Sequence, residues 1–209
     1  MTPSKSGKLL GITINEDLKW REHLINSDSG LVKCLTFRLN ALKKLSVCAS
    51  FRTRLMVANG CFLSVLSYMI IVWGGTEKYL IQALQVIQNK AARCVTKLSW
   101  FTPTRILLRQ CNWLSVSQLI FYHTAIQMWK TRKHEVPVSL HNRFKLSNTR
   151  SRVDGTLAIP AVETSLAKKS YAVRAATTWN QIPVQTRNSA SLMEFKRKLK
   201  PWVLENIPI

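Results

Sequence analysis

Apolar residues recur at intervals of three and four positions in the stretch that follows Gly75. They are Leu80, Leu84, Ile87, Ala91, Val95 and Leu98. This spacing places the six side chains on one face of an α-helix and predicts that the face is buried. Lys90, Arg93 and Lys97 fall on another side of the same helix, which we expect to face outward.

A long uncharged run precedes this helix, because no charged side chain occurs from Leu55 to Thr76. A helix packed on all sides inside a helical protein has this composition, and so has a membrane-spanning helix. Polar residues within the run, such as Asn59 and Ser64, favour the buried helix, for which Ser50 is a suitable N-cap. A basic membrane-associated protein with residues 55–73 inserted is the alternative.

The chain before the run predicts one strand and an interrupted helix. Lys8–Ile14 contains β-branched residues in partial alternation, which predicts a short strand. No second strand follows it, so its pairing partner is expected elsewhere. Leu18–Leu45 has a helical composition, but Ser27–Gly30 interrupts it, so a kinked helix and two separate helices both fit.

The chain after residue 98 predicts further helices at residues 104–110, 115–131 and 171–180. The second of these has Leu119, Tyr122, Ile126 and Trp129 on its apolar side. Residues 132–164 lose this periodicity and carry many Lys and Arg residues, which predicts a long basic loop with one short strand near residues 156–159.

The last helix has a clear start at Ser191-Leu-Met-Glu194, a capping box in which the serine and glutamate side chains satisfy free backbone amides. Its expected apolar stripe is Leu192, Phe195, Leu199 and Trp202. Pro201 cannot donate a backbone hydrogen bond, so we expect a kink or an end there.

Together these elements predict a mostly α-helical protein, a helical bundle with one or two short N-terminal or loop strands. We expect four parts. They are a strand at residues 1–17, a helical bundle at 18–131, a basic loop at 132–164 and a C-terminal helical segment at 165–209.

The charge balance points to an anionic partner. The chain has 31 Lys and Arg against 10 Asp and Glu, a formal net charge of +21, and the basic residues are spread along its whole length. Such an excess attracts polyanions, so nucleic acid is the expected partner and an anionic membrane surface is the rival.

The sequence has none of the usual patterns of catalytic or metal-binding sites. No Asp-Asp pair, glycine-rich phosphate loop, nucleophile elbow or His-Glu-x-x-His sequence occurs. The five cysteines and four histidines are not spaced as zinc ligands. We therefore expect no enzyme activity, metal, cofactor or small-molecule substrate. Free thiols and an N-terminus without an apolar leader indicate an intracellular protein, cytoplasmic or nuclear.

Two basic clusters are the candidate nucleic-acid contacts. The first is Lys90, Arg93 and Lys97, and the second is Lys196, Arg197 and Lys200. Each cluster fits a solvated helix face equally well. Trp73, Trp100, Trp113 and Trp179 have aromatic rings on which bases can stack, but core packing is the favoured interpretation for each.

Several motifs, in order, resemble one family. Lys8–Ile14 and Asp17-Leu-x-Trp20-x-x-His23 are followed by Tyr68-x-x-x-x-Trp73-Gly-Gly75 and by Leu84-Gln-x-x-Gln88-Asn-Lys-Ala-Ala-Arg93. Thr102-Pro-Thr, Trp113-Leu, Trp179-Asn-x-Ile-Pro183, Arg187 and Ser191-Leu-x-x-Phe195-Lys continue the series. The set resembles the thumb region, and the segments flanking it, of reverse transcriptases from non-LTR (LINE-type) retrotransposons.

This resemblance implies an RNA-directed DNA polymerase whose thumb grips a template–primer hybrid, with the strand at 1–17 as a remnant of the palm edge. The family's Asp-Asp motif lies upstream of the matched region and is absent here. The resemblance therefore implies a non-catalytic C-terminal fragment that binds RNA or an RNA–DNA hybrid. A protein-interaction remnant or a relic without function is the other alternative.

Overall fold

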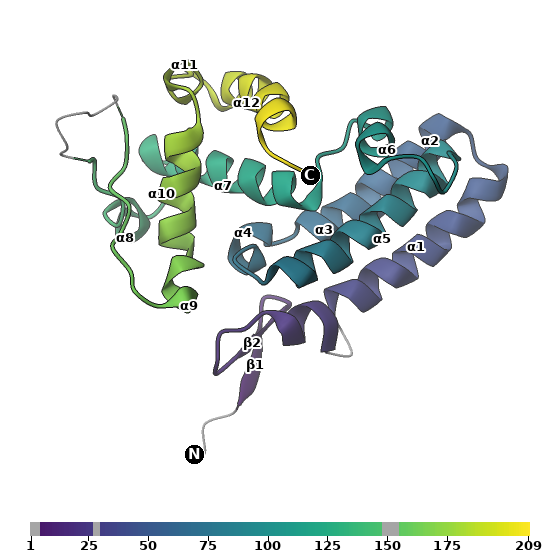
Figure 1. The fold of residues 1–209 in the computed structure, drawn as a ribbon, viewed down its shortest axis with the longest axis horizontal. Coiled ribbons are helices and arrows are strands. Elements are labelled where there is room, and N and C mark those ends of the chain that lie inside the picture. Colours follow the sequence, from purple (N-terminus) through teal and green to yellow (C-terminus); the bar gives the residue numbers. More distant parts are fainter. Residues whose placement is uncertain (1–4, 27–29, 148–154) are drawn as a thin grey trace. The chain divides into compact units, whose positions relative to one another are not determined.

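The computed structural model describes residues 5–26, 30–147 and 155–209, and most of them are helical (Figure 1). The mostly α-helical prediction is confirmed. The chain forms two compact units, Met1–Val116 together with Ile209, and Ser117–Pro208. The expected division into parts at residues 17, 131 and 164 stays a prediction.

The first unit begins with a hairpin of β1 (Ser6–Leu9) and β2 (Ile12–Asn15), which pair antiparallel from Ser6↔Asn15 to Leu9↔Ile12. The prediction of one strand with a distant partner is wrong. Leu10 (φ 48°) and Gly11 (φ 79°) both adopt the left-handed conformation. This turn lets the strand fold back on itself, because its twist matches that of the two strands.

The interrupted helix is two helices, a π-helix η1 (Glu22–Asn26) and α1 (Leu31–Cys48). The predicted interruption at residues 27–29, with Asp28, lies outside the described residues. In α1 the buried residues are Leu31, Leu35, Leu39 and Leu42, a spacing of three and four that gives the helix one core-facing stripe.

The uncharged run forms consecutive helical segments and then a break. The segments are α2 (Phe51–Val57), the π-helix η2 (Ala58–Leu63) and α3 (Ser64–Ser67), followed by α4 (Ile70–Trp73). Met69 between α3 and α4 has φ 51°, in the left-handed region, which ends the first helical stretch. The Ser50 N-cap is confirmed, since its hydroxyl accepts a hydrogen bond from the Thr53 amide.

The prediction that this run is buried on all sides is wrong. Its buried positions Ala58, Phe62, Leu66 and Ile70 form one stripe at four-residue spacing, which continues from the buried Arg54 just before the run. Met56, Tyr68 and Val72 are exposed. In the part of the chain that the structure describes, none of the helices has both the length and the apolar character needed to cross a membrane.

The predicted amphipathic helix is α5 (Lys78–Thr96), which packs against α1, α2 and α6 (Thr104–Cys111). In Figure 1, α1 and α5 run side by side along the first unit. Five of the six predicted apolar positions are buried, and Leu98 lies half-buried beyond the end of the helix. Lys97 ends α5 in the left-handed conformation (φ 58°).

Arg54 joins the ends of two helices in this core. Its Nε donates to the carbonyl of Val95 (2.8 Å) near the end of α5, and its Nη1 donates to the carbonyl of Ala49 (2.5 Å) after α1. The last carbonyls of a helix lack helical partners and carry partial negative charge. The buried Arg54 guanidinium is stable in this position because these carbonyls accept its hydrogen bonds.

The second unit contains most of α7 (Val116–Arg132), with α10 (Tyr171–Gln181), α11 (Val184–Arg187) and α12 (Leu192–Asn206). Phe195 of α12 lies between Trp129 and Trp179, at ring-centroid distances of 6.0 and 6.2 Å. The predicted apolar side of α7 is partly wrong. Trp129 is buried, but Leu119, Tyr122 and Ile126 are only half-buried, and Phe121, Ala125 and Met128 face the core instead.

Within its described residues, the segment predicted as a basic loop contains one short helix, α8 (Val138–His141), and α9 (Ser165–Lys168) begins directly after its predicted end. An isolated bridge pairs Leu146 with Leu157, within the region where a short strand was expected. Arg150 and Arg152 of this basic segment lie outside the described residues. Farther on, α12 does not end at Pro201 but continues to Asn206.

Candidate nucleic-acid interface

Several polar side chains of α5 form hydrogen bonds with other segments of the first unit. Gln85 accepts a hydrogen bond from the Val116 amide (2.9 Å), and Gln88 donates to the Leu114 carbonyl (2.9 Å). Asn89 donates to the Thr104 hydroxyl (2.9 Å) at the start of α6. The motif Leu84-Gln-x-x-Gln88-Asn therefore fixes the start of α6 and the segment that follows it.

Arg93 also binds another segment of the first unit, whereas the sequence predicted that it faces outward. The side chain is half-buried, and its Nη2 donates to the carbonyls of Trp100 (2.9 Å) and Thr102 (3.5 Å). The guanidinium carbon lies 4.6 Å from the centroid of the Trp100 ring. Arg93 therefore holds the loop at residues 97–103 against α5, and its contact with phosphate stays a prediction.

Lys90 and Lys97 do face outward. Both are exposed, and neither has an ion-pair partner among the described residues. Lys97 owes its position to the left-handed end of α5, where the chain turns into the loop. These two lysines are the members of the first predicted cluster that can reach an external anion directly.

A signal that the predicted clusters missed is the distribution of acids. No Asp or Glu occurs from residue 78 to residue 134. Nine Lys and Arg lie in this stretch: Lys78, Lys90, Arg93, Lys97, Arg105, Arg109, Lys130, Arg132 and Lys133. Arg105 and Arg109 are exposed on α6, which packs against α5. The spacing between acids in the sequence reveals this stretch, whereas the total charge does not.

Lys43 of α1 adds to the positive potential near the end of α5. Burial raises the pKa of the Cys94 thiol, and the Lys43 charge opposes that rise in pKa. Because its charge acts on the Cys94 thiol, Lys43 lies within electrostatic reach of the last turns of α5, and its side chain is exposed. The same region of the first unit thus receives positive charge from α1, α5 and α6.

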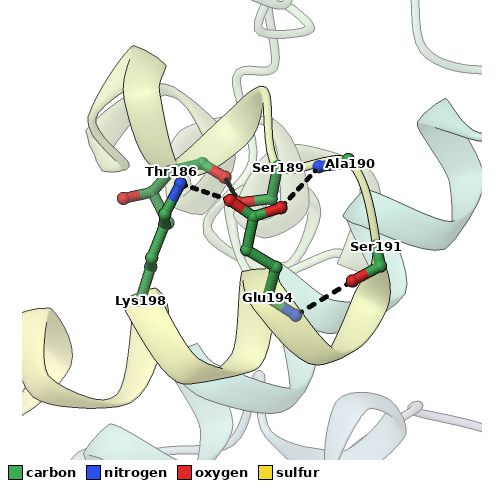
Figure 2. A network of polar contacts seen from close by, with 6 residues as sticks. All are labelled: Thr186, Ser189, Ala190, Ser191, Glu194 and Lys198. Atoms are coloured by element: carbon green, nitrogen blue, oxygen red, sulfur yellow. Dashed lines mark hydrogen bonds and ion pairs between the residues drawn. The ribbon is translucent and has the colours of Figure 1, made fainter.

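The second predicted cluster lies beside a well-formed helix start, shown in Figure 2. The Ser191 hydroxyl accepts from the Glu194 amide (3.2 Å), and Glu194 Oε2 accepts from the Ala190 amide (3.0 Å). Lys198 Nζ donates to Glu194 Oε1 (2.6 Å), a hydrogen bond that holds the pKa of the Glu194 carboxyl below its ordinary value. The predicted capping box is confirmed, with Glu194 binding the amide one residue before the N-cap.

The three predicted site residues of α12 differ in their surroundings. Lys196 and Arg197 are exposed, and Lys200 is half-buried with its pKa lowered by burial. Burial and, secondarily, the Lys196 charge lower the pKa of His123. Lys196 and Arg197 are thus better placed for an external anion than Lys200.

The four candidate tryptophans differ in their exposure to solvent. Trp73, Trp113 and Trp179 are buried. Their indole N–H groups donate to Tyr68 O (3.0 Å), Asn59 Oδ1 (2.8 Å) and Gly155 O (3.0 Å), respectively. The core interpretation is confirmed for these three. It is wrong for Trp100, whose side chain is 64% exposed.

The tail motif Trp179-Asn-x-Ile-Pro183 also has a structural explanation. Asn180 accepts from the Leu157 amide and donates to the Leu157 carbonyl, both at 2.9 Å. Together with the Trp179 bond to Gly155, this pair attaches residues 155–157 to α10. Arg187 is buried nearby, and within the described residues its Nε and Nη1 have no hydrogen-bond partner.

The described residues contain no group of three or more His, Cys, Asp or Glu side chains arranged to hold a metal ion. The exposed members of the two predicted clusters are the cations Lys90, Lys97, Lys196 and Arg197. Such groups bind and orient an anionic partner.

Comparison with known proteins gives one distant relationship. No protein-family model and no solved structure matches the chain. It is 27% identical over 132 residues to a probable RNA-directed DNA polymerase from transposon BS of Drosophila melanogaster, a match that covers 63% of this chain. The matched region spans 14% of that protein's length. The chain is thus distantly related, over part of its length, to an RNA-directed DNA polymerase from a transposon.

Proposed function

We propose that this chain is the non-catalytic, nucleic-acid-binding C-terminal part of a non-LTR retrotransposon reverse transcriptase. It grips an RNA–DNA template–primer hybrid through phosphate contacts. The observation that carries the proposal is the surface of α5 and α6, where cations are exposed in a stretch of chain without a single acid.

Electrostatics support binding on this surface. Lys90, Lys97, Arg105 and Arg109 are exposed, and Lys43 adds its charge near the end of α5. Phosphate backbones attract such cations, and counterions are released when the two meet. Lys196 and Arg197 of α12 provide a second, smaller contact in the other unit.

The distant relative supports the choice of ligand, because its name describes a polymerase that copies RNA into DNA. The sequence lacks an Asp-Asp pair, and polymerase chemistry needs carboxylates that hold two metal ions. We therefore propose binding without primer extension for this chain.

The test is the affinity of the full chain for an RNA–DNA hybrid as a function of salt. Four phosphate contacts predict that the association constant falls about a hundredfold between ~50 and ~200 mM salt. The double variant Lys90→Gln/Lys97→Gln should bind more weakly and with a smaller salt slope. The matched control, Lys5→Gln/Lys168→Gln, removes the same charge from outside both predicted clusters.

Undetectable binding, or binding that does not change with salt, would refute the proposal. Equal losses in the two double variants would show that only net charge matters and would refute the α5 surface. Primer extension by the purified chain with magnesium would refute the non-catalytic part.

A further inference from the structure

The loop at residues 97–103, called here the aromatic loop, exposes two adjacent aromatic side chains. Trp100 is 64% exposed and Phe101 is 91% exposed. Leaving a large apolar side chain in water forfeits the free energy that its burial would provide. Two adjacent aromatic side chains exposed to solvent at the tip of one turn are typical of a surface that binds a ligand or partner.

The aromatic loop is a defined turn held by several hydrogen bonds. The Thr102 amide donates to the Ser99 carbonyl (3.1 Å), which closes a four-residue turn with Trp100 and Phe101 at its centre. The Phe101 amide donates to the Ser99 hydroxyl (3.4 Å), and the Leu98 amide donates to the Thr96 hydroxyl (3.3 Å). The exposure of the two rings is therefore a property of an ordered turn.

Arg93 orients the first of these rings. It binds the Trp100 carbonyl and places its guanidinium 4.6 Å from the centroid of the indole ring. One face of the indole is thus covered by a cation, and the exposure of the side chain leaves the other face open to solvent. A planar group that stacks on the open face would complete a sandwich of guanidinium, indole and ligand.

The surroundings of the aromatic loop are positive. Lys97 and Lys90 are exposed on the loop and on the helix that carries it, and no acid occurs between residues 78 and 134. The ligand that suits this surface is anionic and presents flat, unsaturated rings. A single-stranded nucleic acid has both properties, because its phosphates meet the cations while its unpaired bases are free to stack.

We propose that Trp100 and Phe101 form a base-stacking platform for single-stranded nucleic acid beside the phosphate-binding surface of α5. This inference rests on the proposed function and adds to it the part of the ligand that is recognised. Stacking tolerates any base, so the platform confers preference for unpaired over paired strands and little sequence preference.

The experiment compares the full chain with Trp100→Ala and Phe101→Ala, using a fluorescent oligouridine of about 15 nucleotides. The same measurement is made with an abasic phosphodiester of equal length, which has the charges but not the bases. Each substitution should weaken oligouridine binding by about tenfold, the effect of losing one stacked base. Binding of the abasic strand and the salt slope should stay unchanged.

Two further variants control for the fold and for the chemistry. Phe37→Ala removes another exposed aromatic ring, 77% exposed on α1, and should leave both affinities unchanged. Trp100→Phe keeps an aromatic ring and should retain most of the binding that Trp100→Ala loses. Thermal unfolding of each variant confirms that the comparison is between folded proteins.

The outcomes separate this inference from the proposed function. If neither strand binds while the RNA–DNA hybrid does, the platform alone is overturned; if the hybrid does not bind either, the proposed function fails and the platform fails with it. If both strands bind equally and Trp100→Ala changes nothing, the platform alone is overturned. If Trp100→Ala leaves oligouridine affinity unchanged but the variant no longer floats with anionic vesicles, the platform is overturned in favour of a membrane surface. If the variant instead loses binding to another protein, the platform is overturned in favour of that protein.

Discussion

The guanidinium of Arg93 donates to the backbone carbonyl of Trp100 at 2.9 Å while it lies over the indole ring of the same residue. A residue that the sequence pattern places among phosphate-binding cations thus acts first as a positioning residue. It links the end of α5 to the aromatic loop by a hydrogen bond and a cation–π contact.

This relationship predicts how Arg93 variants behave. Arg93→Lys keeps the charge but not the planar fork that binds a carbonyl and covers a ring. We expect Arg93→Lys to lose nearly as much oligouridine affinity as Arg93→Gln, with faster hydrogen exchange at the Phe101 and Thr102 amides. If Arg93 instead acted through direct phosphate contact, Arg93→Lys would bind almost as well as the native chain.

Arg54 is predicted to be a stability residue. Arg54→Met would leave the carbonyls of Val95 and Ala49 without their donor. Hydrogen bonds from a charged group are strong, so we expect a loss of roughly 2–4 kcal/mol in the free energy of unfolding. Arg52→Met, at an exposed position of the same helix, should change it by less than about 0.5 kcal/mol. Denaturant unfolding measures both, and similar losses would contradict the assignment.

Arg187 is predicted to behave in the opposite way. It is 6% exposed, its Nε and Nη1 lack hydrogen-bond partners within the described residues, and burial lowers its pKa. An apolar side chain of similar size removes this desolvation cost, so Arg187→Leu should be neutral or stabilising by about 1 kcal/mol. Arg174→Leu is the control: burial lowers the pKa of Arg174 as well, but its Nε donates to the Lys169 carbonyl (3.2 Å), so the loss of that hydrogen bond should destabilise the protein. A destabilising Arg187→Leu would contradict this assignment.

Glu194 is predicted to make stability depend on pH. The hydrogen bond from Lys198 lowers the pKa of this carboxyl in the folded protein, below the ordinary value of 4.5. A group with a lowered folded pKa stabilises above its ordinary pKa and loses that contribution as pH falls through the lowered value. The stability difference between the native chain and Glu194→Gln should therefore be largest near neutral pH and shrink below about pH 4.5.

Unfolding measured across pH, with Lys198→Gln as a second variant, tests this cause. Removing Lys198 removes the largest contribution to the lowered pKa of Glu194. In a Lys198→Gln chain, the loss of stability caused by Glu194→Gln should therefore be smaller and less dependent on pH. A Lys198→Gln chain with the same pH profile as the native chain would contradict the assignment.

Much of the fold could be predicted from the sequence, because its local signals agree with its packing. The buried stripe of α5, the N-cap at Ser50 and the capping box at Ser191 all appear where the residue pattern places them. The face of α7 was predicted less well because this helix is buried or half-buried along its whole length. A helix with apolar residues all round carries little periodic signal.

The candidate site was less predictable, because the sequence does not show which polar residues the fold uses. Lys90 and Arg93 are three positions apart on one helix, yet one faces solvent and the other binds the aromatic loop. That difference arises from a tertiary contact, the return of residues 97–103 over the end of α5. Likewise, tryptophan is a residue type that is usually buried, and Trp100 is exposed because of the turn that contains it.

The hairpin turn at Leu10 is tied to a residue far along the chain, since the Tyr68 hydroxyl donates to the Leu10 carbonyl at 2.9 Å. An isolated two-stranded hairpin is marginally stable in water. Closing a loop of 58 residues costs entropy that must be offset before the contact forms. We therefore expect the hairpin to dock late in folding, after α1 and the uncharged run have packed. An N-terminal fragment that ends before Tyr68 lacks this tie and keeps the hairpin's local contact, the hydrogen bond from the Thr13 amide to the His23 ring (3.4 Å).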